Sequence, residues 1–118
     1  MPVRGIRGAI TVDTDTADEI VTATRELLLA IVTANGLRLT DVASALFTTT
    51  PDLSATYPAR AARELGWIDV PLLGATEMGV PDGLARCIRV LVHINTRKSA
   101  ARIKHIYLRG ARALRPDL

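Results

Sequence analysis

Apolar residues alternate with polar or small ones near the start of the chain, in the segment VRGIRGAITV at residues 3–12. Such an alternation is typical of a strand with one buried face. Ile6 and Ile10 fall on the apolar face, whereas Arg7 points to the opposite side among small neighbours. These neighbours leave room for a ligand at the Arg7 guanidinium, although an Arg on an exposed sheet face is the plainer interpretation.

A different spacing follows, in which apolar residues recur at every third or fourth position over residues 20–31. The preceding Thr16-Ala-Asp-Glu19 has the form of a capping box, and acidic residues in a first turn suit the helix dipole. Asn35-Gly36 supplies a stop signal. We therefore predict a helix of about five turns whose apolar stripe covers one face of a sheet.

Four further segments have the composition of strands, namely residues 41–50, 70–77, 87–96 and 105–114. A short helix is expected after Tyr57-Pro58, and a loop or helical turn is expected over 97–102. The sequence has neither internal repeats nor a linker. It therefore predicts an α+β fold in a single domain over residues 1–118, with a mixed sheet of about five strands, one long helix and one or two short helices.

Three of the predicted strands place a polar residue opposite their aliphatic side. In CIRVLVHINT the alternation puts Ile88 and Val90 on one face and Arg89 on the other, and Tyr107 lies opposite its aliphatic neighbours in the same way. Arg7, Arg89 and Tyr107 therefore share a face that the long helix does not cover. We expect oligomerisation to bury this second face.

Composition narrows the classes of partner. The formal net charge is +3, from 15 Lys and Arg against 12 Asp and Glu, which suits an anionic partner. The basic residues are mostly single arginines, which suit two-point recognition of a carboxylate. Aromatic residues are few and no recognition helix or RNA-binding platform is apparent, so we expect no nucleic-acid partner.

Cysteine and histidine usage points away from disulfides and metals. Cys87 is the only cysteine, which excludes an intrachain disulfide and suits a reducing compartment. His93 and His105 have no sequence neighbours at metal-ligand spacing, so we expect both to be structural or surface residues. No stretch approaches the ~20 apolar residues that span a bilayer. We expect a soluble, cytoplasmic protein that needs no metal and no cofactor and has no membrane partner.

The segment TPDLSATYPARAAREL allows two interpretations. Its short helix is either an amphipathic surface element, with Arg63 paired to Glu64 or a neighbour, or one wall of an anion site formed by Tyr57, Arg60 and Arg63.

The segments RGIRGA, TPDL, YPARAAREL, EM, CIRV, Y and LRPDL occur in this order over nearly the whole chain. Together they resemble the small trimeric chorismate mutase family of the Bacillus type. The resemblance implies a homotrimer with a pseudo-α/β-barrel core and active sites between subunits. It also implies conversion of chorismate to prephenate, an intramolecular Claisen rearrangement in phenylalanine and tyrosine biosynthesis.

By position, the resemblance implies four main site residues: Arg7, Glu77, Arg89 and Tyr107. It implies that the same site is lined by Leu73, Gly74, Ala75, Thr76, Leu114 and Arg115. It implies that the adjacent subunit supplies Tyr57, Ala59, Arg60 and Arg63. Gly74 stands where the family commonly has a cysteine, so a contact to the substrate hydroxyl is missing or is made by backbone or water. For Glu77 the alternative is a strand-end carboxylate that caps the turn or pairs with an Arg.

This chemistry fits the residues present. The rearrangement requires no nucleophile, proton transfer or metal, and the sequence has no Ser/His/Asp set, phosphate-binding glycine loop or metal-ligand spacing. Chorismate carries two carboxylates, for which Arg7 and Arg63 are the expected clamps with Tyr107 as a further donor. Arg89 would donate to the ether oxygen and Glu77 would face the ring. The alternative function is a non-catalytic trimeric module that binds an anionic metabolite.

Overall fold

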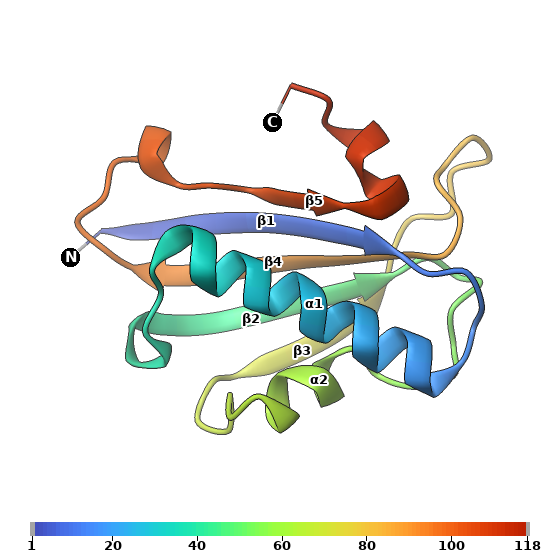
Figure 1. Cartoon of the computed structure of the whole chain (residues 1–118), viewed down its shortest axis with the longest axis horizontal. Helices are drawn as coiled ribbons and strands as arrows, with labels where there is room; N and C mark the ends of the chain where they lie inside the picture. The colour runs from blue at the N-terminus through green and yellow to red at the C-terminus, as the bar shows by residue number, and fades with distance from the viewer. Residues whose placement is uncertain (1, 118) are drawn as a thin grey trace.

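The structure is a computed structural model that describes residues 2–117. Its central element is a five-stranded sheet in the order β3-β2-β4-β1-β5 (Figure 1). The strands are β1 (Val3–Thr11), β2 (Val42–Thr49), β3 (Leu72–Thr76), β4 (Cys87–Asn95) and β5 (Ile106–Leu108). The helices are α1 (Ala17–Asn35) and α2 (Ala59–Glu64), with 3-10 turns η1 (Leu39–Asp41), η2 (Ala100–Arg102) and η3 (Arg109–Leu114). The predicted α+β class and the mixed five-stranded sheet with one long helix are confirmed.

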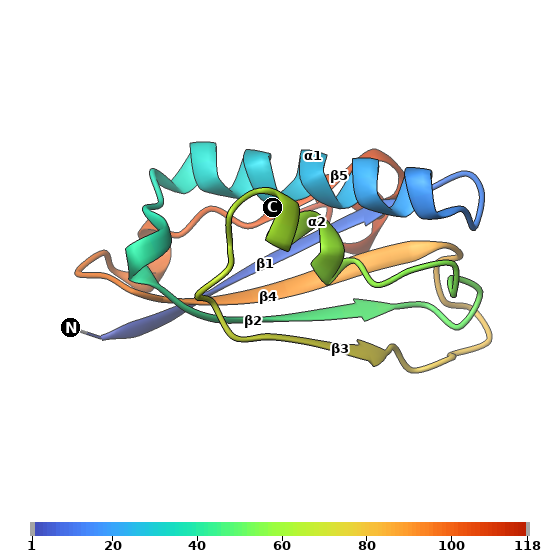
Figure 2. The same ribbon diagram turned by 90° about the horizontal axis from the view of Figure 1, so that it is seen from below.

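The sheet combines both kinds of strand pairing. β4 runs antiparallel to β1 and to β2, whereas β3 is parallel to β2 and β5 is parallel to β1. Both α-helices lie on one face of the sheet (Figure 2). On the opposite face, η3 packs Ala111 against Ala9 and Cys87 at one end, and Leu84 also packs against this cluster. The strands therefore present one closed face and one largely open face.

The long helix begins and ends at the predicted residues. The Thr16 hydroxyl accepts the backbone N–H of Glu19 at 3.2 Å, and Gly36 ends the helix in the left-handed conformation at φ 59°. One detail differs from a standard capping box: the Glu19 carboxylate accepts the N–H of Asp13 at 3.2 Å, so it ties the preceding loop to the helix. These local bonds fix the direction in which α1 leaves β1.

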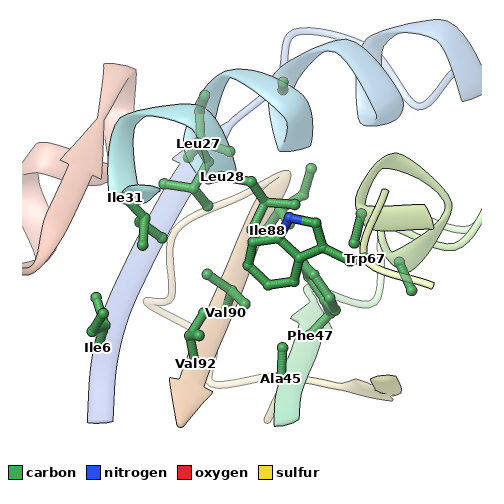
Figure 3. Packing of buried hydrophobic residues seen from close by; sticks show 14 of the residues in the cluster. Ile6, Leu27, Leu28, Ile31, Ala45, Phe47, Trp67, Ile88, Val90 and Val92 are labelled. Carbon is green, nitrogen blue, oxygen red and sulfur yellow. The ribbon is translucent and has the colours of Figure 1, made fainter. Parts of the chain in front are cut away.

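The closed face holds the main hydrophobic core (Figure 3). Trp67, which follows α2, packs with Phe47 and Ile88 of the sheet beneath the buried stripe of α1. Burial of each such side chain stabilises the fold by about 1.5–3 kcal/mol. Gly8 allows α1 to approach β1 closely, because a Cβ there would lie 2.8 Å from Ile31 Cδ1. The core therefore accounts for the aliphatic face of each predicted strand.

The prediction of a fifth strand over residues 105–114 is wrong in its second half. β5 ends at Leu108, which is paired with Ile10, and β1 itself ends one residue later at Thr11. Arg109 then takes a positive φ of 53° and turns the chain off the sheet into η3. The N–H of Gly110 donates to the Thr11 hydroxyl at 3.0 Å. β5 therefore ends because Arg109 turns the chain away, one residue before its pairing partner β1 ends.

Candidate active site

Four of the predicted site residues meet on the open face of the sheet. Arg7 from β1, Arg89 from β4, Tyr107 from β5 and Glu77 from the end of β3 line one cavity of about 240 Å³. The strand register explains the convergence, because Ala9 of β1 is paired with Arg89 on one side and with Tyr107 on the other. Residues paired across a sheet point to the same face. Arg7 lies two positions along β1 and so joins them.

Glu77 reaches the cavity from just beyond the last residue of β3. Its backbone N–H donates to the Thr49 carbonyl at 2.8 Å, which extends the ladder between β2 and β3 by one bond. Its carboxylate Oε1 accepts the N–H of Met78 at 3.1 Å, and Oε2 accepts the Thr48 hydroxyl at 3.1 Å. Oε2 also lies 3.6 Å from the Nε of Arg89. The turn-capping and Arg-pairing alternatives for Glu77 are thus both observed, inside the cavity.

Arg89 carries a donor that has no acceptor. The Nε atom is buried and has no hydrogen-bond partner within residues 2–117. The side chain as a whole is 41% exposed, so the guanidinium is accessible from the cavity while its Nε–H is shielded from bulk water. A shielded donor of this kind is suited to an acceptor that arrives with a ligand.

His105 connects β5 to the backbone beside the site. Its Nδ1 accepts the backbone N–H of Arg7 at 2.9 Å, so this nitrogen carries no proton. Burial lowers the pKa of His105 from its ordinary value because it disfavours the cation, and the nearby charges of Arg7 and Arg115 lower it further. Of the two predicted alternatives, structural or surface, His105 thus has the structural one. His93 has a structural role as well, since its Nδ1 lies 3.1 Å from the Ser44 hydroxyl.

The chain after η3 stays near the cavity. Leu114 packs with Tyr107 against the small cluster of Ala9, Cys87 and Ala111. Arg115 makes two hydrogen bonds to the Asp117 carboxylate, at 3.0 and 2.7 Å. Cys87 is buried and free, and burial raises the pKa of its thiol. Leu114 thus reaches the same small cluster as Tyr107, but neither Leu114 nor Arg115 is among the residues that line the cavity.

The second predicted set lies elsewhere in the chain. Tyr57, Ala59 and Arg63 line a hollow of about 360 Å³ with Leu73 and Gly74, beside the edge strand β3. A neighbouring hollow of about 490 Å³ includes Tyr57, Gly74, Ala75 and Thr76. Neither hollow has a lining residue in common with the cavity of Arg7. Within one chain the two predicted sets of residues therefore line separate hollows.

The ion pairs of the short helix α2 differ from the predicted alternative in which Arg63 pairs with Glu64 or a neighbour. Glu64 pairs with Arg60 at 3.2 Å and with Arg25 at 2.7 Å, and Arg63 takes no part in either ion pair. Arg63 is exposed and lines the hollow beside Tyr57. The charge of Arg63 is thus available to an anion, whereas that of Arg60 is partly neutralised by Glu64.

Sequence reasoning missed Thr48, which lines the cavity and binds Glu77. The alternation along β2 places Thr48 opposite the buried Phe47, but only the strand register brings it beside Arg89. Within residues 2–117, no group of three or more His, Cys, Asp or Glu side chains is placed to hold a metal ion. Across the same residues, no helix has the length and apolarity that crossing a membrane requires.

Comparison with known proteins gives concordant results. Residues 3–118 match the family model described as chorismate mutase type I. The chain is 53% identical over 117 residues to chorismate mutase AroH of Thermus thermophilus, covering 98% of this chain and 96% of that protein. It is 46% identical over 119 residues to chorismate mutase AroH of Bacillus subtilis, covering 100% of this chain and 94% of that protein.

A solved structure agrees with the fold as well. The chorismate mutase from Clostridium thermocellum superimposes with a TM-score of 0.91 at 49% sequence identity, covering 92% of this chain and 97% of that chain. On the family model, the two full-length relatives and this structure, the chain belongs to the chorismate mutase type I family.

Proposed function

We propose that this protein is a chorismate mutase, which converts chorismate to prephenate by an intramolecular Claisen rearrangement in the synthesis of phenylalanine and tyrosine. The observation that carries the proposal is the convergence of Arg7, Glu77, Arg89 and Tyr107 on one cavity. Family membership and about 50% identity to named chorismate mutases support it. The proposed single domain spans residues 1–118.

The chemistry follows from fixed charges. Chorismate must fold into a compact conformer before its reacting carbons meet, and cations at its two carboxylates select that conformer. Arg7 and Tyr107 bind from the open face, and Arg63 binds from the hollow beside Tyr57. As the carbon–oxygen bond lengthens, negative charge grows on the ether oxygen. Arg89 donates to this oxygen, and a donor that is already in place needs no reorganisation during the reaction.

Glu77 adds a negative charge to the otherwise cationic site. Its carboxylate lies beside Arg89 and faces the substrate ring, where positive character develops as the ether bond breaks. Leu73, Ala75 and Thr76 precede Glu77 in the chain and line the hollows beside Tyr57, not the cavity of Arg7. At Gly74 an added Cβ would meet no atom within 4 Å, so the residue leaves open space where the family commonly has a cysteine. Backbone groups or water there would meet the substrate hydroxyl.

We propose a homotrimer with active sites between subunits, each formed by the cavity of Arg7 in one subunit and the residues beside Tyr57 in the next, here called the two half-sites; their separation within one chain supports the proposal. In this assembly Tyr57, Ala59, Arg60 and Arg63 of one subunit complete the cavity of the next. The open face supports the proposal, since Leu73 is 67% exposed on β3 and Val3 is 55% exposed on β1. Oligomerisation would cover these side chains. We also propose a cytoplasmic location, which suits the buried free thiol of Cys87.

Turnover tests the proposed function directly. The purified protein should consume chorismate, seen as loss of its ultraviolet absorbance, with prephenate as the product. A protein that binds chorismate and leaves it unchanged would instead be the non-catalytic binding module. Sedimentation of the same preparation should give the mass of three chains, and a monomer would contradict the shared site.

Subunit mixing tests which chain supplies Arg63. Arg7→Ala and Arg63→Ala are each expected to lose most activity. When equal amounts are unfolded together and refolded, a site is intact if one subunit keeps Arg7 and its neighbour keeps Arg63. Random assembly then restores about a quarter of wild-type activity. If both residues belonged to one chain, mixing would restore nothing, and the intersubunit site would be rejected.

A further inference from the structure

Thr48 occupies a position between the two charged residues of the cavity. It lies on β2, paired with Arg89 of β4 on one side and with Ala75 of β3 on the other. Two residues beyond Ala75, the chain reaches Glu77. The Thr48 hydroxyl therefore stands between the strand that carries the guanidinium and the strand that leads to the carboxylate.

The Glu77 carboxylate is held at both of its oxygens. Oε1 accepts the backbone N–H of Met78, and Oε2 accepts the hydroxyl of Thr48, each at 3.1 Å. Glu77 and Met78 are fixed along the sheet by the bond from the Glu77 N–H to the Thr49 carbonyl. The backbone thus sets the place of the carboxylate, and the Thr48 hydroxyl sets its rotation.

This rotation decides what the Arg89 Nε–H can bind. Nε lies 3.6 Å from Glu77 Oε2, whereas charge-assisted N–H···O bonds are about 2.7–2.9 Å long. The donor is buried and has no hydrogen-bond partner within the described chain. A small turn of the carboxylate would close the gap. Arg89 would then have its shielded donor occupied.

We propose that Thr48 is a positioning residue that holds Glu77 Oε2 off the Nε–H of Arg89, so that this donor stays available to the substrate. The inference rests on the proposed function in one respect, the identity of the ether oxygen as the acceptor. Without the hydroxyl, Oε1 remains on the Met78 N–H and Oε2 turns to the nearest remaining donor, Arg89 Nε. Glu77 Oε2 then competes with the ether oxygen of the transition state for the Arg89 Nε–H.

Two substitutions separate the hydroxyl from the shape of the side chain. Thr48→Val keeps the size and branching, and we expect kcat to fall about tenfold or more while KM changes by less than about threefold. Thr48→Ser keeps the hydroxyl and should retain kcat within about threefold of wild type. Thr22→Val makes the same chemical change on the exposed face of α1 and should have no effect. If the wild-type protein is active and Thr48→Val has the same kcat, the proposal is overturned. Equal losses of kcat in Thr48→Val and Thr48→Ser would also overturn it.

A double-substitution cycle tests whether Thr48 acts through Glu77. In a Glu77→Gln background the carboxylate that would be drawn to Arg89 is gone. Thr48→Val should then lower kcat by less than about threefold, instead of the tenfold seen in the parent. Full additivity of the two substitutions would show that Thr48 acts independently of Glu77 and would reject the positioning role.

A spectroscopic measurement tests the geometry without turnover. In a proton–nitrogen correlation spectrum of the unliganded protein, the Nε–H signal of Arg89 is identified by its loss in Arg89→Lys. We expect this signal to move downfield in Thr48→Val, as it gains a carboxylate acceptor, and to stay near the wild-type position in Thr48→Ser. An unmoved signal in Thr48→Val would refute the inference. A moved signal in a protein that leaves chorismate intact would uphold the positioning role and reject the proposed function.

Discussion

The two faces of the sheet are built from the same strands, but one forms the hydrophobic core and the other carries the polar residues of the cavity. On the closed face, Ile88 and its neighbours are fully buried beneath α1 and Trp67, and their contacts are apolar. On the open face, Arg89 and Glu77 stand 3.6 Å apart, and a buried donor lacks an acceptor within the described residues. The closed face makes all of its packing contacts within one chain, whereas the open face presents a donor that is suited to a ligand or a second subunit.

This contrast between the two faces shows how a small protein can place the residues that stabilise its fold apart from those that line its cavity. Successive residues of a strand point to opposite faces, so Ile88 and Arg89 are covalent neighbours with separate roles. The closed face supplies the apolar burial that fixes the strand register. That register in turn places polar groups on the open face to within hydrogen-bond distances. Substitutions at adjacent positions should therefore have separable effects.

The largest effect is expected on the closed face. Ile88→Ala removes a fully buried side chain, and the lost transfer free energy plus the cavity should lower the free energy of unfolding by about 2–5 kcal/mol. Chemical denaturation at fixed protein concentration measures this change. Protein that remains folded should keep kcat within about threefold of wild type. A large loss of kcat without loss of stability would contradict the division between the faces.

The next effect belongs to the open face. Arg89→Ala should lower kcat about 100-fold or more, because a preorganised donor at the ether oxygen is lost. Its free energy of unfolding should change little. Arg89→Lys should also be poor, because an ammonium cannot reproduce the fork geometry of a guanidinium. Turnover and denaturation of both variants give the comparison, and near-normal turnover in Arg89→Ala would remove Arg89 from its role.

The smallest effect is a pH dependence at His105, where β5 meets β1. Its folded-state pKa is lowered by burial and by Arg7 and Arg115, so the unfolded chain binds a proton first as pH falls. The stabilisation is complete above the unfolded pKa near 6.5 and is lost as pH falls through the lower folded value. We expect a loss of about 1 kcal/mol or less between pH 7 and 5.

Matched variants isolate this titration. His105→Asn retains a side-chain acceptor for the Arg7 N–H without titrating, so its unfolding free energy should fall less with acid than that of the wild type. His93→Asn alters the other histidine and should keep the wild-type slope. Denaturation curves at several pH values provide the measurement. Equal slopes in His105→Asn and wild type would show that His105 does not contribute.

Much of the fold was predictable because its signals are local. The helix from Ala17 to Asn35 depends on a capping threonine, an apolar spacing and a terminal glycine, all of which lie within the helix or next to it. The alternation in β4 likewise fixes which side chains share a face. The fifth strand was overestimated because residues after Leu108 have strand-like composition. Its end depends on the turn at Arg109 and on the bond from the Gly110 N–H to the Thr11 hydroxyl of β1, a residue from another part of the chain.

The amino-acid sequence alone was enough to predict the long helix, four of the five strands, the polar face and, through its ordered motifs, the family. Which residues of that face touch one another depends on the folded chain. Thr48 shows the limit: its composition and spacing are those of any strand threonine, and it gains a partner only when β2 pairs with β4 and β3. Hydrogen bonds act over about 3 Å, whereas Thr48 and Glu77 are 29 positions apart in the chain. The strand register, which packing on the closed face fixes, brings the two side chains within that distance.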